Sequence, residues 1–452
     1  MEFFLHSFGC RATQADGAAI ERQLAEKGLI RAVRATEAKL VVLNTCTVTA
    51  AADQDARAAI RRVHRENPDA KILVTGCYAQ RAPQEVAALP GVTWVVGNSH
   101  KHLVAEIASG QAPQNFVPLE NVFLSAPAFT VIGDIFAHTE LIAAPVFAAD
   151  NIAEKTRPNL KVQDGCNNRC SFCIIPSVRG QSRSMRLERV MDEANALAAA
   201  GYREIVLSGI NLGQWGRDFQ PQQRFGELLR SLLEFTDIAK IRISSVEPMD
   251  WNDGLISLVA GSSRIAKHAH VPLQSGSDRI LRRMHRRYRP WHYAEKIRKI
   301  REAMPHAAVG ADVMVGFPGE TDELFEESRS FIERTPFTYL HVFTYSSRPG
   351  TASADMPDQV PVHVARERNR VLRDLAAKKN LEFRRRFVGK TLEVITLQAG
   401  DEQSTEALSD NYLKVRVAGQ LEANRVMKVD VTEIGDEDLV AMAQEEAASL
   451  AV

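Results

Sequence analysis

Three cysteines in the loop Asp164-Gly165-Cys166-Asn167-Asn168-Arg169-Cys170-Ser171-Phe172-Cys173 constrain this chain more than any other feature. The spacing Cys-x3-Cys-x2-Cys is tight enough to turn three thiolates toward one face of a [4Fe-4S] cluster. Three ligands serve four irons, so one iron keeps the open position that is typical of a catalytic metal site. A small molecule that chelates through an amino group and a carboxylate group suits that open iron. The alternative is a zinc site that a distant fourth ligand completes.

Three more cysteines, Cys10, Cys46 and Cys77, each follow a predicted strand in the first third of the chain. In an open parallel sheet, ligands bind at the carboxyl ends of the strands, so these thiolates should converge on a second metal site. The alternative is that they are half-buried cysteines acting as small apolar side chains. The predicted strands of this α/β domain are Glu2–Phe8, Lys39–Asn44, Lys71–Thr75 and Val92–Val96, with helices at Ala15–Lys27 and Asp53–Glu66.

The length of 452 residues indicates about three domains. We expect an N-terminal domain at 1–108, a connecting segment at 109–156, a central domain at 157–386 and a C-terminal domain at 387–452. No apolar run is long enough to span a membrane, and the N-terminus lacks the pattern of a signal peptide. We therefore expect a cytoplasmic protein, in which cysteines indicate metal ligation more than disulfides.

The central domain repeats a strand–loop–helix unit six times, which predicts an open (β/α)6 relative of the eight-stranded TIM barrel. Small polar residues and glycines follow each strand, where barrel enzymes place their sites. Singly each loop is an ordinary turn, but together with the cysteine loop they predict a cofactor pocket. The predicted strands are Asn159–Gln163, Glu204–Leu207, Lys240–Ile243, Lys267–Val271, Val309–Val315 and Tyr339–Tyr345. The candidate cofactor-binding residues are Phe172, Gly209, Asn211, Ser244, Glu247, Gln274 and Val315.

Four motifs occur together and in order: Asn44-Thr45-Cys46-Thr47-Val48-Thr49, Val74-Thr75-Gly76-Cys77-Tyr78-Ala79-Gln80, the cysteine loop, and Val315-Gly316-Phe317-Pro318-Gly319-Glu320-Thr321. From residue 1 to about 385 the chain resembles the radical SAM methylthiotransferases. The resemblance implies that Cys10, Cys46 and Cys77 hold an auxiliary [4Fe-4S] cluster. It implies that Cys166, Cys170 and Cys173 hold the radical SAM cluster, with S-adenosylmethionine (SAM) at its open iron. The chain departs from the family at Thr13, where asparagine is usual.

The chemistry of three of the candidate pocket residues suggests their roles. Gly209 would let the backbone approach the amino group of SAM closely. Glu247 would accept hydrogen bonds from the ribose or pair with the cation. Phe172 would pack on the adenine or shield the cluster.

Among the branches of this family, the motifs are most similar to the one that methylthiolates threonylcarbamoyladenosine in tRNA. The implied reaction uses one SAM to methylate a sulfur at the auxiliary cluster. A second SAM yields a radical that removes hydrogen from carbon 2 of the adenine. The implied partners are the tRNA anticodon stem-loop, an electron donor and a sulfur source.

Three other functions are alternatives. Two are methylthiolation of isopentenyladenosine in tRNA and of a ribosomal-protein aspartate. The third is a non-enzymatic iron–sulfur scaffold that binds RNA, which two open-iron sites disfavour.

The end of the chain offers candidates for binding RNA. Residues 363–390 form a basic helical stretch with ten arginines and lysines against three acidic residues. Arg384, Arg385 and Arg386 at its end, and Arg289 in an earlier basic run, are predicted to contact phosphates; the alternative is a solvated helix. After residue 387, β-rich runs at Thr391–Gln398, Asn411–Val417 and Arg425–Ile434 predict a small β-barrel, a TRAM domain by resemblance. Its thirteen acidic residues against five basic ones would repel phosphate, so the helix is the better candidate.

Overall fold

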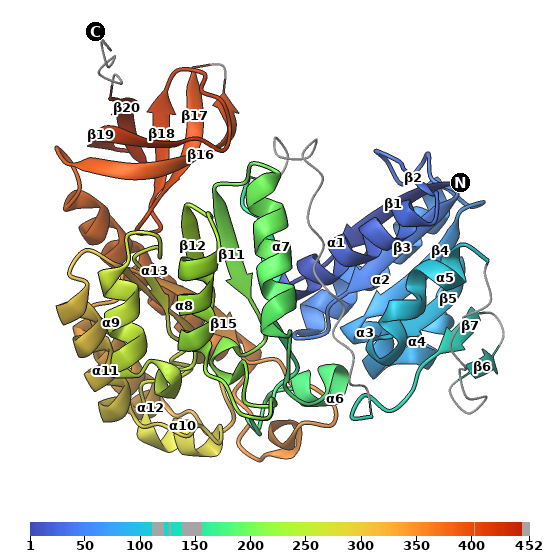
Figure 1. Cartoon of the computed structure of the whole chain (residues 1–452). Coiled ribbons are helices and arrows are strands. Elements are labelled where there is room, and N and C mark those ends of the chain that lie inside the picture. The colour runs from blue at the N-terminus through green and yellow to red at the C-terminus, as the bar shows by residue number, and fades with distance from the viewer. Residues whose placement is uncertain (111–121, 126–127, 138–155, 402, 445–452) are drawn as a thin grey trace, which may run out of the picture.

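The computed structural model describes residues 1–110, 122–125, 128–137, 156–401 and 403–444. These residues form an N-terminal α/β domain, a central barrel that is open on one side and a small C-terminal β-barrel (Figure 1). The predicted fold class is therefore confirmed. None of the described helices is long and apolar enough to cross a membrane.

The N-terminal domain is a parallel sheet with helices on both faces. Its elements are β1 (Glu2–Ser7), α1 (Arg11–Glu26), β2 (Ile30–Arg31), β3 (Leu40–Thr45), α2 (Ala50–Glu66), β4 (Lys71–Gly76), α3 (Cys77–Arg81), α4 (Pro83–Ala87), β5 (Val92–Gly97), the 3-10 helix η1 (Asn98–Leu103) and α5 (Val104–Ala108). Along β3, Val41 and Leu43 pack into one apolar core, whereas Leu40 and Val42 pack into the core on the other face. A strand buried on both faces reads as the continuous apolar run that made β3 predictable.

The segment predicted as a mere connection, residues 109–156, contributes two strands to this sheet. In its described part, β7 (Ala128–Val131) pairs parallel to β5, and β6 (Val122–Ser125) pairs antiparallel to β7. The sheet order is β2-β1-β3-β4-β5-β7-β6. Most of the rest of this segment lies outside the described residues.

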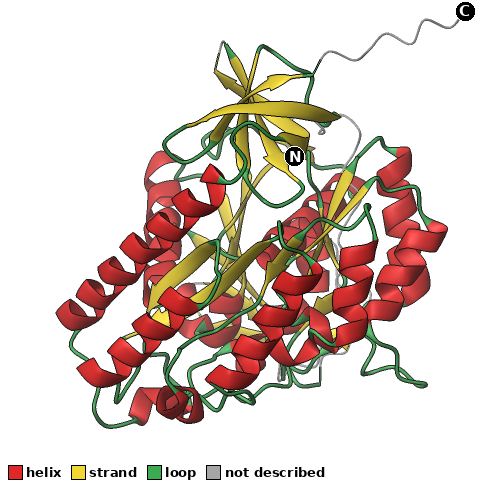
Figure 2. Ribbon diagram, turned by 90° about the vertical axis from the view of Figure 1, so that its left-hand side faces the viewer, coloured by secondary structure: helices red, strands yellow, loops and turns green. Residues whose placement is uncertain are grey.

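The central barrel consists of two three-stranded parallel sheets, β8-β11-β12 and β13-β14-β15. Single bridges between Ile241 and Ile265 and between Ser245 and His270 join the two sheets into one arc. Its helices lie outside the strands (Figure 2). The strands are β8 (Asn159–Lys161), β11 (Glu204–Ser208), β12 (Lys240–Ile243), β13 (His268–His270), β14 (Ala308–Val315) and β15 (Tyr339–Thr344). The helices are α7 (Leu187–Ala199), α8 (Phe225–Phe235), α9 (Asp253–Gly261), α10 (Asp278–Arg283), α11 (Pro290–Ala303), α12 (Asp322–Arg334) and α13 (Val362–Arg385).

The cysteine loop leaves the barrel directly after β8. A short antiparallel pair, β9 (Gln163–Asp164) and β10 (Arg183–Ser184), brackets this loop and the helix α6 (Ile175–Arg179) that follows it. In Figure 1, α6 lies between the barrel and the N-terminal domain. The loop therefore faces the seam between these two domains.

The C-terminal barrel docks at the opposite end of the central barrel from the cysteine loop. Arg242 at β12 donates hydrogen bonds to the carbonyls of Ser409 and Asp410, and Asn411 donates to the carbonyl of His306, just before β14. Its strands are β16 (Thr391–Asp401), β17 (Ser404–Ser409), β18 (Lys414–Ala418), β19 (Val426–Ile434) and β20 (Leu439–Ala443), closed in the order β16-β17-β18-β20-β19. The sequence predicted a β-barrel but missed β17 and β20.

Candidate functional site

The three cysteines of the loop lie close enough for their charges to interact. The Cys173 amide donates to the Cys170 carbonyl at 3.1 Å, which closes a tight turn. Burial raises the pKa of the Cys173 thiol to about 12, and the neighbouring Cys170 and Cys166 add to the rise. Burial also raises the pKa of Cys166, so a strong positive charge, such as that of iron, would be needed to ionise Cys166 and Cys173 at pH 7. This donor set therefore fits a metal cluster.

An arginine that the sequence analysis missed touches this site. The Arg286 guanidinium, which is buried, donates from Nη1 to Cys170 Sγ at 3.2 Å and from Nη2 to the Glu247 carboxylate. Glu247, predicted to contact the cofactor, is thus held beside the cluster loop by Arg286. Arg289, predicted from the same basic run to contact phosphates, donates to the carbonyls of Arg286 and Tyr288 and pairs with Asp278 at 3.2 Å, and its contact with RNA stays a prediction.

Phe172 lies in an apolar cluster around the cysteine loop. Its ring meets the buried Phe317 ring edge-on, with the centroids 6.4 Å apart, and it packs near Met314 of β14. Phe317 belongs to the fourth family motif, so this motif supports the cluster loop from behind. The predicted stacking of Phe172 on an adenine stays a prediction.

The loop after β11 is held against the cysteine loop by a buried glutamine. Gln163 accepts a hydrogen bond from the Asn211 amide at 2.7 Å and donates to the Gly165 carbonyl at 2.8 Å. A Cβ on Gly209 would come within 3.0 Å of the Gln163 side chain, so the backbone there approaches closely. Asn211 Nδ2 lies 3.9 Å from Cys166 Sγ, while its buried Oδ1 has no partner in the described structure. An unsatisfied acceptor beside the cluster fits a pocket that receives a ligand donor.

The three other predicted pocket residues lie at the same end of the barrel. Ser244 follows β12, and its amide donates to the Leu207 carbonyl at the end of β11. Gln274 adopts a left-handed backbone with φ of 65° and accepts a hydrogen bond from the Met314 amide, next to Val315. The structure thus gathers these residues at one rim, and their contacts to a cofactor stay predictions.

Cys10, Cys46 and Cys77 converge at the carboxyl ends of β1, β3 and β4. A Cβ on Gly9, which has a φ of 85°, would lie 2.8 Å from Cys46 Sγ, so glycine is required beside the thiol. Burial raises the pKa of Cys46 to about 12, and the nearby Cys77 and Cys10 add to the rise. As at the cysteine loop, these donors suit a metal cluster. Thr13 Oγ1 lies 3.4 Å from Cys10 Sγ and takes the place of the usual asparagine.

The two cysteine sets flank helix α6. Cys77 packs directly on Ile174, Ile175 and Val178, which follow Cys173 in the chain. Asn98 Nδ2 donates to the Val178 carbonyl at 2.8 Å and approaches Cys77 Sγ at 3.4 Å. One short helix therefore contacts the binding loops of both predicted clusters.

A buried charge network locks this seam. Asp16 of α1 pairs with Lys101 at 2.9 Å, with Arg179 of α6 at 3.0 Å and with Lys161 of β8. Arg179 also pairs at 2.9 Å with Asp164, the first residue of the cysteine loop. The charged groups of all five residues are at most 10% exposed, so they depend on one another for solvation.

A second set of contacts ties the Cys46 loop to the far edge of the barrel. Asp53 accepts hydrogen bonds from Thr47 Oγ1 at 2.6 Å, from Arg81 at 3.0 Å and from Arg348 at 2.7 Å. Arg348 belongs to the loop after β15, whereas Lys161 lies on β8. The N-terminal domain thus contacts both edges of the open barrel and closes its gap.

The structure contradicts the prediction that Arg384 contacts RNA. It is buried and donates to the carbonyls of Gly435, Asp436 and Asp438 at 2.7–2.9 Å, so it fastens α13 to the C-terminal barrel. Arg385 and Arg386 are exposed, and their contact with RNA stays a prediction.

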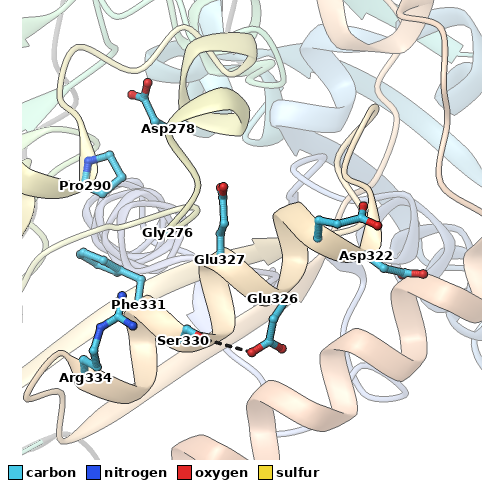
Figure 3. A pocket seen from close by; sticks show the side chains of 10 residues that line it. Gly276, Asp278, Pro290, Asp322, Glu326, Glu327, Ser330, Phe331 and Arg334 are labelled. Atoms are coloured by element: carbon cyan, nitrogen blue, oxygen red, sulfur yellow. Dashed lines mark hydrogen bonds between the residues drawn. The ribbon is translucent and has the colours of Figure 1, made fainter.

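A groove of about 850 Å³ lies between α12 and the segment from Gly276 to Pro290, and no cysteine lines it (Figure 3). Carboxylates line it, with Glu326 bonded to Ser330, so it repels phosphate and is not the site. Its lining residues are Gly276, Asp278, Pro290, Asp322, Glu323, Glu326, Glu327, Ser330, Phe331 and Arg334.

Two family models match the chain: the Radical SAM superfamily at residues 160–332 and the uncharacterized protein family UPF0004 at residues 2–97. The threonylcarbamoyladenosine tRNA methylthiotransferase MtaB of Bacillus subtilis is 38% identical over 95% of this chain and 93% of its own length. A tRNA-2-methylthio-N(6)-dimethylallyladenosine synthase of Thermobifida fusca is 33% identical over 95% and 83%.

Among solved structures, the radical S-adenosylmethionine methyltransferase TsrM from Kitasatospora setae has a similar fold. The TM-score is 0.59 at 15% identity, and the match covers 78% of this chain and 76% of that one. At this identity the likeness concerns the fold alone. This likeness in fold is consistent with the central barrel and the N-terminal α/β domain, which carry the two cysteine sets.

Proposed function

This chain belongs to the radical SAM methylthiotransferase family and is an enzyme of that type, and from this membership we propose that it adds a methylthio group to N6-threonylcarbamoyladenosine in tRNA. The observation that carries the proposal is the pair of cysteine sets on either side of α6. Such a pair suits a reaction in which sulfur is handled at one cluster and a radical is made at the other. All six cysteines of the chain are used.

The enzymes of this family use SAM and two [4Fe-4S] clusters, which supply the chemistry that an unactivated C–H bond requires. Cys166, Cys170 and Cys173 would hold one cluster, and Cys10, Cys46 and Cys77 the other. The protein's own part is positioning. Arg286 donates hydrogen bonds to the Cys170 sulfur and to the Glu247 carboxylate beside the pocket, and the ion pairs of the seam network connect the domains that carry the two loops.

The target adenosine would have to leave the base stack to enter the space between the two loops. MtaB of Bacillus subtilis supports the threonylcarbamoyl branch through its higher identity. The lower identity to the dimethylallyladenosine synthase makes that branch the second candidate. Methylthiolation of a ribosomal-protein aspartate is not better supported than these two.

An electron donor and a sulfur source are the further partners that the proposed reaction calls for. We also propose the cytoplasm as the place of reaction, since the proposed substrate is tRNA. The exposed Arg385 and Arg386 are proposed to contribute to tRNA binding through phosphate contacts.

Mass spectrometry of tRNA nucleosides tests the proposed function. A strain that lacks the gene should lose the 2-methylthio form of threonylcarbamoyladenosine and accumulate its precursor. The wild-type gene should restore the product, whereas a Cys170→Ala variant should not. Loss of the dimethylallyl-type product instead would assign the enzyme to the other branch, and an unchanged nucleoside profile would refute the proposal.

A further inference from the structure

Two histidines and an aspartate share the inner face of the barrel on β13, β14 and β15. Asp312 is directly opposite His341 in the parallel register, and His270 lies opposite Gly310 on the same strand as Asp312. Their neighbours along the strands, such as Ala311 and Leu340, pack outward against the helices. Because side chains alternate along a strand, the three polar residues point together into the barrel.

The donor atoms of this group are close to one another. His270 Nε2 lies 3.3 Å and His341 Nδ1 lies 3.2 Å from the same oxygen, Asp312 Oδ1. One donor atom from each of the three residues fits within a span of 4.8 Å. Metal–ligand bonds of about 2.0–2.2 Å at tetrahedral angles place donors roughly 3.4 Å apart, so these separations are those of a chelate.

Hydrogen bonding accounts for only part of the arrangement, because His341 Nδ1 is hydrogen-bonded to Asp312 Oδ1 at 3.2 Å and His270 is not. His270 is 8% exposed, and its Nε2 makes no hydrogen bond despite its approach to Asp312. Among the described residues, no lysine or arginine forms an ion pair with Asp312, and its ionic partners are the two imidazoles. A partly buried carboxylate with an unsatisfied imidazole beside it lacks a cation.

We propose that His270, Asp312 and His341 bind one divalent transition-metal ion in the barrel, separate from both cysteine sets. Two imidazoles and one carboxylate are a donor set that Zn²⁺, Fe²⁺ and Co²⁺ accept with coordination positions left open. The His341 side chain is 51% exposed, so solvent reaches this part of the barrel interior. The open coordination positions of the ion would therefore accept water or another oxygen donor.

The position of the site relates it to the cofactor pocket. Met314, the next residue on the same face of β14 after Asp312, packs near Phe172 of the cysteine loop. Ser245, which bridges to His270, lies two residues before Glu247. An ion bound here therefore sits on the wall of the chamber whose rim carries the pocket residues.

Cobalt is a suitable probe because it differs from the iron of the clusters. The cluster-loaded protein, with no affinity tag, is dialysed anaerobically against Co²⁺, and bound cobalt and iron are measured by mass spectrometry. His341→Ala and Asp312→Asn remove one ligand each, and both positions are accessible enough for the fold to tolerate the change. His363→Ala, an exposed histidine on α13, is the matched control.

The wild type and His363→Ala should retain about one cobalt per chain, and the two ligand variants should bind it at least about tenfold more weakly. Iron content should be the same in all four proteins, so a loss of cobalt cannot be a loss of clusters. The cobalt absorption edge of the wild type should show imidazole ligands. Equal cobalt binding by wild type, His341→Ala and Asp312→Asn, or none by the wild type, would overturn the proposal.

Discussion

Replacing Asp16 by asparagine should destabilise the protein strongly, because one carboxylate at the domain seam balances three cations. Asp16 is 1% exposed and contacts Lys101, Lys161 and Arg179, with Asp164 as the other anion of the network. Removing one partner of a buried ion pair costs about 3–5 kcal/mol. A loss of that size lowers the Tm by an amount on the order of 10 °C.

The acid sensitivity of the seam should change with the same substitution. Burial raises the pKa of Asp16, but the attraction of Lys101, Lys161 and Arg179 outweighs it and holds the pKa well below its usual range. A lowered folded pKa contributes stability above about pH 3.9, the ordinary pKa of an aspartate, and this stability is lost as the pH falls through the folded value. Asp16→Asn should therefore lose its stability deficit in strong acid, where the wild-type carboxylate is also neutral.

The assay is anaerobic thermal unfolding of the cluster-loaded protein, followed by circular dichroism at several pH values. Asp253→Asn is the matched control, because Asp253 pairs with Lys299 at 2.8 Å on an exposed surface and should matter little. Asp16→Leu combined with Lys161→Met should recover part of the loss, because replacing a buried pair by apolar groups is often neutral. If Asp16→Asn and Asp253→Asn unfold at the same temperature, the charge network does not hold the domains together.

Three further predictions concern Arg286, His268 and the arginines at the end of α13. Arg286→Lys should weaken SAM binding by about tenfold, measured by equilibrium dialysis, while iron content stays unchanged, since a charge-assisted hydrogen bond is lost. Burial, and next the charge of Arg242, lowers the pKa of His268 well below 6.5. Below pH 6.5 this histidine is therefore protonated in the unfolded chain but stays neutral in the folded protein. Stability should therefore fall from pH 6.5 to 5, less so in His268→Gln, as urea unfolding would show. The double variant Arg385→Ala/Arg386→Ala should reduce tRNA affinity and the salt dependence of binding. Arg384→Ala should instead lower the Tm and leave the salt dependence of binding unchanged. The reverse pattern would contradict the burial of Arg384.

The sequence was most informative where local pattern decides structure. Cys166, Cys170 and Cys173 are placed by spacing alone, and the convergence of Cys10, Cys46 and Cys77 follows from the rule for strand ends in parallel sheets. The buried strands were found because both faces are apolar. These features rely on contacts that are near in sequence or repeat along it.

What the sequence could not provide depends on distant partners. Arg286 and Arg289 lie in one basic run that contains a left-handed residue, His285, with a φ of 57°, and the sequence does not reveal that Arg286 contacts Cys170. Arg384 reads as a surface arginine until the C-terminal barrel is placed over it. Asp16 meets Lys161 across 145 positions of the chain, so no local pattern announces that contact.

The division of labour between the two cysteine sets is the central claim, and one reaction tests it directly. Purified wild-type, Cys46→Ala and Cys170→Ala proteins are incubated with SAM, a strong reductant and tRNA carrying threonylcarbamoyladenosine. Deoxyadenosine and the methylthiolated nucleoside are then quantified in the same sample. Cys46→Ala should still cleave SAM to deoxyadenosine but form no methylthiolated product, and Cys170→Ala should lose both activities. Methylthiolated nucleoside from Cys46→Ala, or deoxyadenosine from Cys170→Ala, would contradict the account.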